Sequence, residues 1–292
     1  MNPVREEIVK RLSSINDLPT RSVSMARLCD ALKESHGTAP DFAEIVDIVE
    51  HDVGLAARLI RIANSPRYAG RYDRITSIHQ AINRIGLDKV SKICLAVSAM
   101  QLFPSSSSLL DLADFWVHSI SVAMTIREIA MSKKRTPDIE SLYSAGLFHD
   151  VGALILDRYF PEHYRRTRDS AHRDGVAVYD AERRHLGIDH GEVGSLLLDR
   201  WGLTGQISAA AAFHHFPHEA SESYVAVAQV VHLADFACGA LGAFEPGDSQ
   251  PQESSLSAWD ECGIDIERMR EIISRAQERI GEAGDFVELV NA

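Results

Sequence analysis

The sequence predicts an all-α protein that folds as a two-lobed helical bundle. Apolar residues recur at intervals of three and four residues along most of the chain, as at Phe42, Ile45 and Val49. The strict alternation of apolar and polar residues that marks a half-buried strand is nearly absent. The helical segments are of ordinary length, and the short connections between them carry Pro or Gly, such as Pro66 and Gly86.

Two polar breaks divide the 292 residues. Four consecutive serines follow Pro104 and are typical of a loop between lobes, and a later stretch rich in Pro, Ser and acidic residues is typical of a linker. Beyond it we expect an amphipathic helix from Ile264 to near Gly281 and a last apolar segment that docks on the body. The predicted segments are an N-terminal helical lobe (1–104), a second helical lobe (109–242), the linker (243–256) and C-terminal helices (257–292).

The composition excludes several classes of function. A formal charge of -12 repels a phosphate backbone, and no stripe of Lys and Arg is interleaved with aromatic residues, so nucleic acid is not an expected partner. No apolar run approaches the roughly 18 residues that span a bilayer, and the N-terminus does not resemble a signal peptide, so we expect no membrane association. The four cysteines lack C-x-x-C spacing and favour buried thiols in the cytoplasm.

The strongest chemical signal is the pair His149-Asp150, which interrupts the apolar segment YSAGLFHDVGALIL (143–156). Burying a carboxylate is costly unless it is paired or coordinates a metal, and no neighbour within the segment can neutralise it. Asp235 poses the same problem in the nearly apolar segment 224–241, where it shares a face with Gln229 and His232.

Further histidines have a similar placement. His118 lies in an apolar segment four residues after Asp114, so both side chains could reach a common point. His190 follows Asp189, the expected N-cap of a helix, whose dipole keeps a neighbouring imidazole neutral and able to bind metal. His214 and His215 end a helix of small residues.

Each of these residues also has a simpler interpretation. His118 alone would more often be a hydrogen-bonded core histidine, His190 a residue of a helix cap, and Asp235 the partner of His232 or an arginine. Imidazoles and carboxylates from several apolar helices nevertheless satisfy one another well around a shared cation, as in the metal sites of helical bundles. Mixed nitrogen and oxygen ligands favour iron, manganese, cobalt or zinc over magnesium.

The tetrapeptide HDVG occurs twice. Its first copy, at residues 51–54, is not accompanied by a comparable set of polar residues in apolar segments. It follows an acidic amphipathic helix, so Asp52 is the expected cap of the next helix. We expect His51 to be a solvated surface residue.

The order of His118, His149-Asp150 and Asp235 resembles the metal-ligand pattern of the HD superfamily of phosphohydrolases. Linked phrases identify the chain more narrowly as similar to the HDOD family over residues 15–240, with an HD-like C-terminal lobe. These phrases are LPTRSVSMARL, HDVGLAARLIRIANSPRYAG, ITSIHQAINRIGLDKV, FWVHSISVA, GLFHDVGALIL, DHGEVGSLLLDRWGL and AAFHHFP. The resemblance to the related dinuclear HD-GYP phosphodiesterases implies that Asp150 would bridge two metals, and the implied ligands are His118, His149, Asp150, His190, His214, His215 and Asp235.

Two departures from those catalytic relatives favour a regulatory role. Ala153 occupies the position where the HD-GYP pattern carries a phosphate-stabilising Lys, and the GYP loop is missing after His215. The resemblance therefore implies a bacterial signal-transduction module that acts through signalling proteins, with a divalent metal (Fe, Mn or Zn) or a nucleotide as its ligand, and it assigns no catalytic residue.

The alternative is a metal-dependent phosphohydrolase of nucleotides or cyclic dinucleotides, in which a metal-activated hydroxide attacks and Asp150 or Asp114 is the base. Arg158 and the pair Arg165-Arg166 are the cations available to hold a phosphate, although on helices such residues more often form a solvated face.

Overall fold

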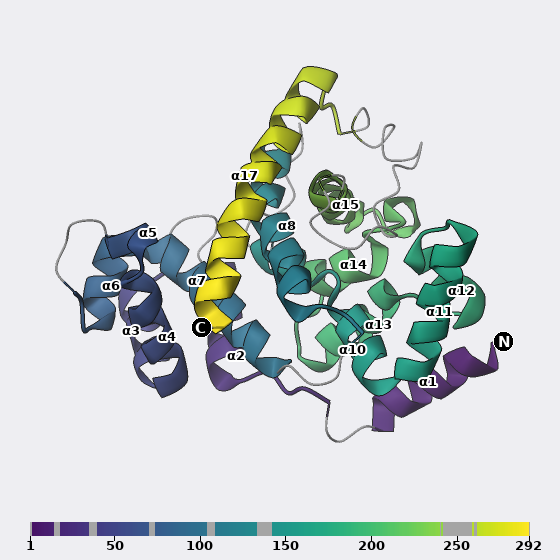
Figure 1. The fold of residues 1–292 in the computed structure, drawn as a ribbon, viewed down its shortest axis with the longest axis horizontal. Coiled ribbons are helices and arrows are strands. Elements are labelled where there is room, and N and C mark those ends of the chain that lie inside the picture. Colours follow the sequence, from purple (N-terminus) through teal and green to yellow (C-terminus); the bar gives the residue numbers. More distant parts are fainter. Residues whose placement is uncertain are drawn as a thin grey trace. The chain divides into compact units, whose positions relative to one another are not determined.

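The fold was analysed in a computed structural model, which describes residues 2–14, 18–34, 40–69, 74–103, 109–132, 142–239, 241, 259 and 262–291. Within these ranges the only regular secondary structure is helical and no strand occurs, which confirms the predicted all-α class (Figure 1). The serines of the predicted loop between lobes and the predicted linker 243–256 lie outside the described residues. The chain divides into two compact units.

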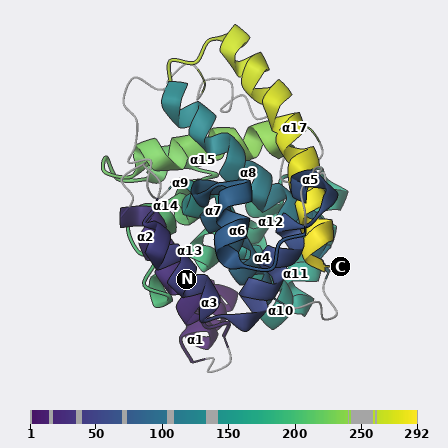
Figure 2. The same cartoon turned by 90° about the vertical axis from the view of Figure 1, so that its left-hand side faces the viewer.

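One unit comprises residues 19–104, 138–141 and 284–292. Its central helix is α7, which contacts α2, α3, α4 and α6 (all labelled in Figure 2). Ser77 and Gln80 form a capping box on α6, and Asn64 exchanges two hydrogen bonds of 2.9 Å with the backbone of Ile75. The helices are α2 (Val23–Glu34), α3 (Phe42–Glu50), α4 (Val53–Ala63), α5 (Pro66–Ala69), α6 (Ile78–Ile85) and α7 (Leu87–Leu102).

The other unit comprises residues 1–18, 105–137 and 142–283. Its core is built around α9, which contacts α8, α14 and α15, while α13 packs on α10 and α14. Its helices are α1 (Pro3–Ser14), α8 (Leu112–Ser132), α9 (Leu142–Phe148), α10 (Val151–Tyr159), α11 (Pro161–Asp174), α12 (Val178–His185), α13 (His190–Arg200), α14 (Gln206–Phe213), the 3-10 turn η2 (Pro217–Glu219) and α15 (Val225–Gly239).

Two glycines let the helices of this core approach closely. A Cβ at Gly146 in α9 would lie 2.8 Å from Cα of Ala123 in α8. A Cβ at Gly152 in α10 would lie only 1.9 Å from the backbone oxygen of His190, at the start of α13. The small residues therefore bring the junction between α9 and α10 directly against the beginning of α13.

The first helix, α1, groups with the second of these units, although the sequence placed it in the N-terminal lobe. Arg5 forms a two-pronged ion pair with Glu192 on α13, and Arg200 donates a hydrogen bond of 3.0 Å to the backbone oxygen of Leu12. These contacts join residues about 190 positions apart, which hydrophobic periodicity does not reveal.

The last helix, α17 (Ile266–Asn291), is longer than predicted. The expectation that it ends near Gly281 was wrong, because glycine in a helix interior costs only about 1 kcal/mol and does not by itself end a helix. Just before it, Trp259 is buried, and its ring lies 6.5 Å from that of Phe236 on α15.

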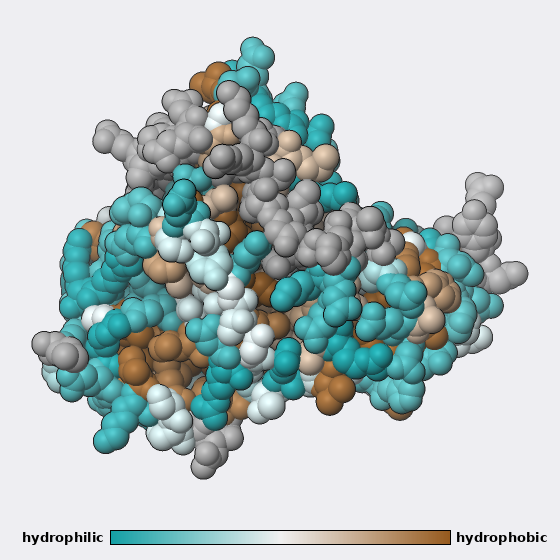
Figure 3. All heavy atoms as spheres, turned by 180° about the vertical axis from the view of Figure 1, so that it is seen from behind, coloured by the Kyte–Doolittle hydropathy of each residue, from teal (hydrophilic) through white to brown (hydrophobic). Residues whose placement is uncertain are grey.

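Among the described helices, none combines the length and the apolar character needed to cross a membrane. The face seen in Figure 3 is largely hydrophilic where its residues are described, with apolar side chains gathered in separate patches.

Candidate metal centre

The structure brings all seven candidate ligands together inside one unit. They come from separate elements: α8 carries His118, the turn between α9 and α10 carries His149 and Asp150, α13 begins with His190, His214 and His215 follow α14, and α15 carries Asp235. They form two groups that meet at Asp150, whose carboxylate presents one oxygen to each.

The first group surrounds Oδ2 of Asp150. Nε2 of His149 lies 3.2 Å and Nε2 of His118 lies 3.6 Å from this oxygen. Oδ1 of Asp235 lies 3.0 Å from Nε2 of His118 and 3.7 Å from Nε2 of His149. Two imidazoles and two carboxylate oxygens thus face one point, where His118, His149 and Asp150 are buried.

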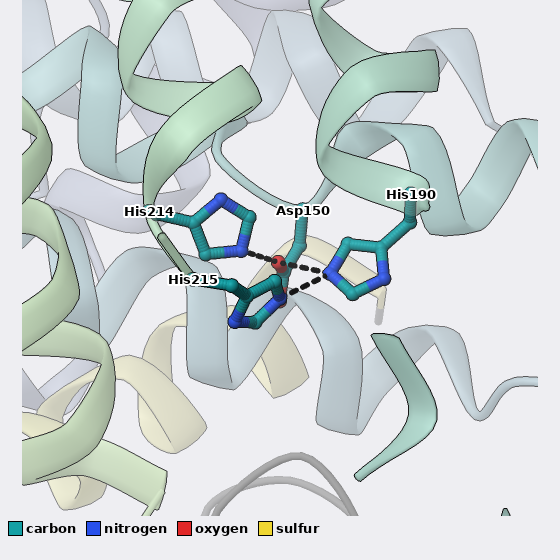
Figure 4. Close-up of side chains that lie close together, drawn as sticks. All are labelled: Asp150, His190, His214 and His215. Atoms are coloured by element: carbon teal, nitrogen blue, oxygen red, sulfur yellow. Dashed lines mark hydrogen bonds and ion pairs between the residues drawn. The ribbon is translucent and has the colours of Figure 1, made fainter. Parts of the chain in front are cut away.

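The second group surrounds Oδ1 of Asp150 and is drawn in Figure 4. Nε2 of His190 lies 3.3 Å and Nε2 of His214 lies 3.2 Å from this oxygen. Nε2 of His215 lies 2.8 Å from Nε2 of His190. Two imidazoles therefore face the other oxygen of the same carboxylate, and the ligand atom of His215 lies within 4.8 Å of theirs.

The hydrogen bonds on the far side of these rings decide which nitrogen faces the carboxylate with a lone pair. Nδ1 of His149 donates to the backbone oxygen of Gly146 (2.8 Å), and Nδ1 of His214 donates to that of Ala211 (2.7 Å). In the neutral ring, Nε2 then carries a lone pair that points at a carboxylate oxygen. Two electron-rich atoms 3.2 Å apart repel each other unless a proton or a metal cation lies between them.

Charge in the cluster is strongly coupled. Burial lowers the pKa of His149, but the carboxylates of Asp150 and Asp235 outweigh it and raise this pKa to about 10. Burial raises the pKa of Asp150, whereas the surrounding histidines, His149 foremost, hold it well below its ordinary value. His118 and His149 likewise hold the pKa of Asp235 low against the effect of burial.

The residues present fit a divalent metal. Nε2 of His149, Nε2 of His214 and Oδ1 of Asp150 are buried side-chain atoms without a hydrogen-bond partner. Imidazole nitrogens and carboxylate oxygens are ligands that iron, manganese and zinc accept, and a carboxylate between two groups can bridge two ions. Metal would replace the protons that otherwise hold these groups together.

Three contacts around the cluster escaped the sequence analysis. Glu182 of α12, which lies in a strongly charged segment, is fully buried and binds His190. Tyr179 of the same helix stacks on the ring of His215. His232 donates a 2.7 Å hydrogen bond from Nδ1 to the backbone oxygen of His214. The sequence does contain one signal for Glu182 and Tyr179: they are three residues apart, a spacing that places both on the same face of a helix.

Some sequence expectations concern residues outside the cluster. Asp114 is exposed in the first turn of α8 and belongs to neither group, so the expectation that it meets His118 at a common point was wrong. Asp52 caps α4 by accepting a hydrogen bond of 3.0 Å from the backbone of Leu55, and His51 is exposed, both as predicted. Arg158, Arg165 and Arg166 are exposed.

A cavity of about 520 Å³ lies beside α13 and α14, and it contains none of the seven candidate ligands. Its charged lining consists of three carboxylates and one guanidinium, that of Arg183. Arg183 is already paired with Asp189 (2.7 Å) and Glu219 (3.2 Å). The excess of negative charge makes this cavity a poor site for a phosphate group.

The HDOD domain model matches residues 18–217, which is more than half of the chain. This chain belongs to the HDOD family. A curated relative of this HDOD protein, an uncharacterized protein of Treponema pallidum, is 22% identical over 247 residues. The match covers 84% of this chain and 46% of the relative, so the chain spans about half the length of the curated relative it matches.

Solved structures show the same fold. An HDOD domain protein with unknown function from Geobacter sulfurreducens is 24% identical, with a TM-score of 0.79 over 98% of this chain and 97% of that one. A Marinobacter aquaeolei protein named "Putative signal transduction protein" is 21% identical, with a TM-score of 0.80, and the match covers 99% of this chain and 65% of that one. A Shewanella amazonensis protein named "Putative phosphohydrolase" is 22% identical, with a TM-score of 0.71, and the match covers 96% of this chain and 97% of that one. At these identities the likeness extends to the fold alone.

Proposed function

We propose that this HDOD chain is a non-catalytic signal-transduction module that binds divalent metal at the His/Asp cluster and controls signalling proteins through its conformation. The observation that carries the metal part of the proposal is the placement of Asp150. Its two oxygens face Nε2 atoms of His149 and His214 at 3.2 Å each, and three of these four atoms are buried without a hydrogen-bond partner. Iron, manganese or zinc held there would link five helical segments of one unit.

The surroundings of Asp150 favour regulation over hydrolysis. Ala153, at the position where the catalytic HD-GYP pattern has lysine, is buried in α10 and offers no cation to a phosphate. Arg158, Arg165 and Arg166 are exposed, and they form no ion pair with Asp150 or Asp235. A bound metal without a phosphate-holding cation would order the fold while giving little stabilisation to a phosphoryl transition state.

The proposal also includes a cytoplasmic location, which the four cysteines support, because all four are buried and none forms a disulfide. Control of a partner requires two conformations that differ in their affinity for metal or for the partner. The cluster is suited to such a role because it joins α8, α13 and α15, whose relative positions a metal would fix.

A second candidate is a metal-dependent phosphohydrolase of nucleotides or cyclic dinucleotides. The two-group arrangement around Asp150 favours it, because a pair of metals is a common device of phosphoester hydrolysis. A bound metal would supply an activated water and stabilise negative charge. In this candidate Asp150 and Asp235 would hold the ions, and His215, which is half-buried, would lie at the edge of the site.

A hydrolysis assay separates the two candidates. Purified protein is supplied in turn with Fe²⁺, Mn²⁺ or Zn²⁺ and incubated with nucleotides and cyclic dinucleotides, and the products are separated by chromatography. We expect no more product from the wild type than from His149→Ala or Asp150→Ala. Turnover by the wild type that both substitutions abolish would overturn the regulatory proposal and support the hydrolase.

A further inference from the structure

One helix, α12, contacts the second group of the cluster through its buried face. Tyr179 and Glu182 are three residues apart, so they lie on the same side of the helix, and both are buried. Neither belongs to the seven candidate ligands. A fully buried glutamate is costly unless it is paired, so its partner identifies what the helix face does.

The partner of Glu182 is His190. Oε2 of Glu182 accepts hydrogen bonds from the backbone nitrogen of His190 (2.7 Å) and from Nδ1 of its ring (2.8 Å). Because the carboxylate accepts, Nδ1 must carry the hydrogen, which leaves Nε2 to face Oδ1 of Asp150 at 3.3 Å. This arrangement of carboxylate, histidine and metal position is a common way to orient a ligand and raise its basicity.

Tyr179 contacts the neighbouring histidine. Its ring stacks on that of His215, with centroids 4.0 Å apart and an angle of 23° between the planes. His215 presents Nε2 to Nε2 of His190 at 2.8 Å, so the stacking restrains the ring of His215 beside that of His190. The next residue of α12, Arg183, pairs with Asp189, which caps α13 immediately before His190.

Two other rings of the cluster are oriented differently. His149 and His214 each donate Nδ1–H to the backbone oxygen of the residue three positions earlier in their own segment. These bonds form within a helical turn and need no other element. Dependence on α12 is therefore concentrated at His190 and His215, in the group around Oδ1 of Asp150.

We propose that α12 is the positioning element for this half of the metal centre, with Glu182 holding His190 in the Nδ1–H form and Tyr179 fixing the plane of His215. The inference rests on the proposed metal binding and goes beyond it, because it assigns different supports to the two halves. Loss of Glu182 weakens the half that contains His190, His214 and His215, and it leaves the half that contains His118, His149 and Asp235 intact.

Zinc titration of the metal-free 292-residue chain, followed by calorimetry and elemental analysis, tests this assignment. The variant Glu182→Gln keeps the shape of the side chain and removes its charge. We expect the wild type to bind two zinc ions, and the variant to bind one as tightly as the wild type and the other about 10- to 100-fold more weakly. The matched control is Glu192→Gln, which removes the charge of a half-exposed carboxylate near the start of α13, the helix that begins with His190, and leaves both affinities unchanged.

Tyr179→Leu is a second variant for the case in which Glu182→Gln does not fold, and it weakens the same ion by a smaller factor. Circular dichroism establishes that each variant is folded. If folded Glu182→Gln bound both ions with the wild-type affinities, the positioning role would be overturned, but the metal centre would not be. Folded Tyr179→Leu decides in the same way if only that variant folds. A wild type that binds no zinc would overturn the proposed function together with this inference.

Discussion

The backbone oxygen of His190 lies where a side chain at Gly152 would have to be, 1.9 Å from the position of its Cβ. The backbone nitrogen of Gly194 is also close, at 2.4 Å. This contact holds the residues after His149-Asp150 against the start of α13. Both neighbours are backbone atoms, which cannot rotate away from an added methyl group.

Gly152→Ala should therefore destabilise the protein by about 3 kcal/mol, since α10 and α13 must separate to admit the methyl group. Urea unfolding followed by circular dichroism measures the change. Gly281→Ala is the control: nothing lies within 4 Å of a Cβ there, and alanine in the middle of α17 should stabilise by up to about 1 kcal/mol. Equal unfolding midpoints for Gly152→Ala and the wild type would contradict the close approach.

Asp150→Asn should remove most of the bound metal, because this carboxylate gives one oxygen to each group of the cluster. Elemental analysis after metal supply and desalting measures the content per chain. The control is Asp114→Asn, which changes an exposed carboxylate on α8, the helix that also carries His118. If both variants kept the wild-type content, Asp150 would not be a ligand.

Metal should also stabilise the fold, because the unfolded chain does not hold these residues together. At a free zinc concentration 100 times the dissociation constant, the free energy of unfolding should rise by about 2.7 kcal/mol for each ion bound. Urea titrations with zinc and with a chelator measure the difference. His149→Ala should show a smaller gain than the wild type, and a wild type that is equally stable in both conditions would be incompatible with metal binding at the cluster.

Alkaline pH should destabilise the protein partly through Cys238. Burial raises the pKa of this thiol to about 12, against an unfolded value near 8.5. The folded state therefore keeps a proton that the unfolded state loses, so its stability contribution is full below pH 8.5 and is lost as the pH rises toward 12. Unfolding free energies measured across pH 8 to 11 should fall less steeply for Cys238→Ala than for the wild type, and parallel slopes would argue against the raised pKa.

Helical periodicity predicted the all-α fold, and polar residues in apolar surroundings predicted a shared buried site, whereas the full set of seven ligands was implied by the resemblance to the HD-GYP phosphodiesterases. His149, Asp150 and Asp235 interrupt helices that are otherwise fit only for burial, so each required a partner inside the protein. Asp114 shows the limit of that reasoning. A spacing of four residues predicts that two side chains lie on the same face of a helix, but it does not predict whether either one is buried. Asp114 is exposed in the first turn of α8.

Glu182 was missed for the opposite reason. It lies among charged residues in VYDAERRH, a pattern that is usually solvated, and only the fold shows that one of these charges is directed inward to His190. The ion pair between Arg5 and Glu192 likewise joins distant parts of the chain through surfaces that have no periodic signal. Pairings of this kind depend on how helices pack, which local patterns do not encode.

The metal centre is tested most directly by anomalous diffraction from crystals of the protein grown with zinc. The geometry predicts two peaks on opposite sides of the Asp150 carboxylate, one about 2.0 to 2.2 Å from nitrogens of His118 and His149 and the other equally close to nitrogens of His190 and His214. A map without a zinc peak at Asp150, from crystals that contain zinc elsewhere, would contradict the metal centre.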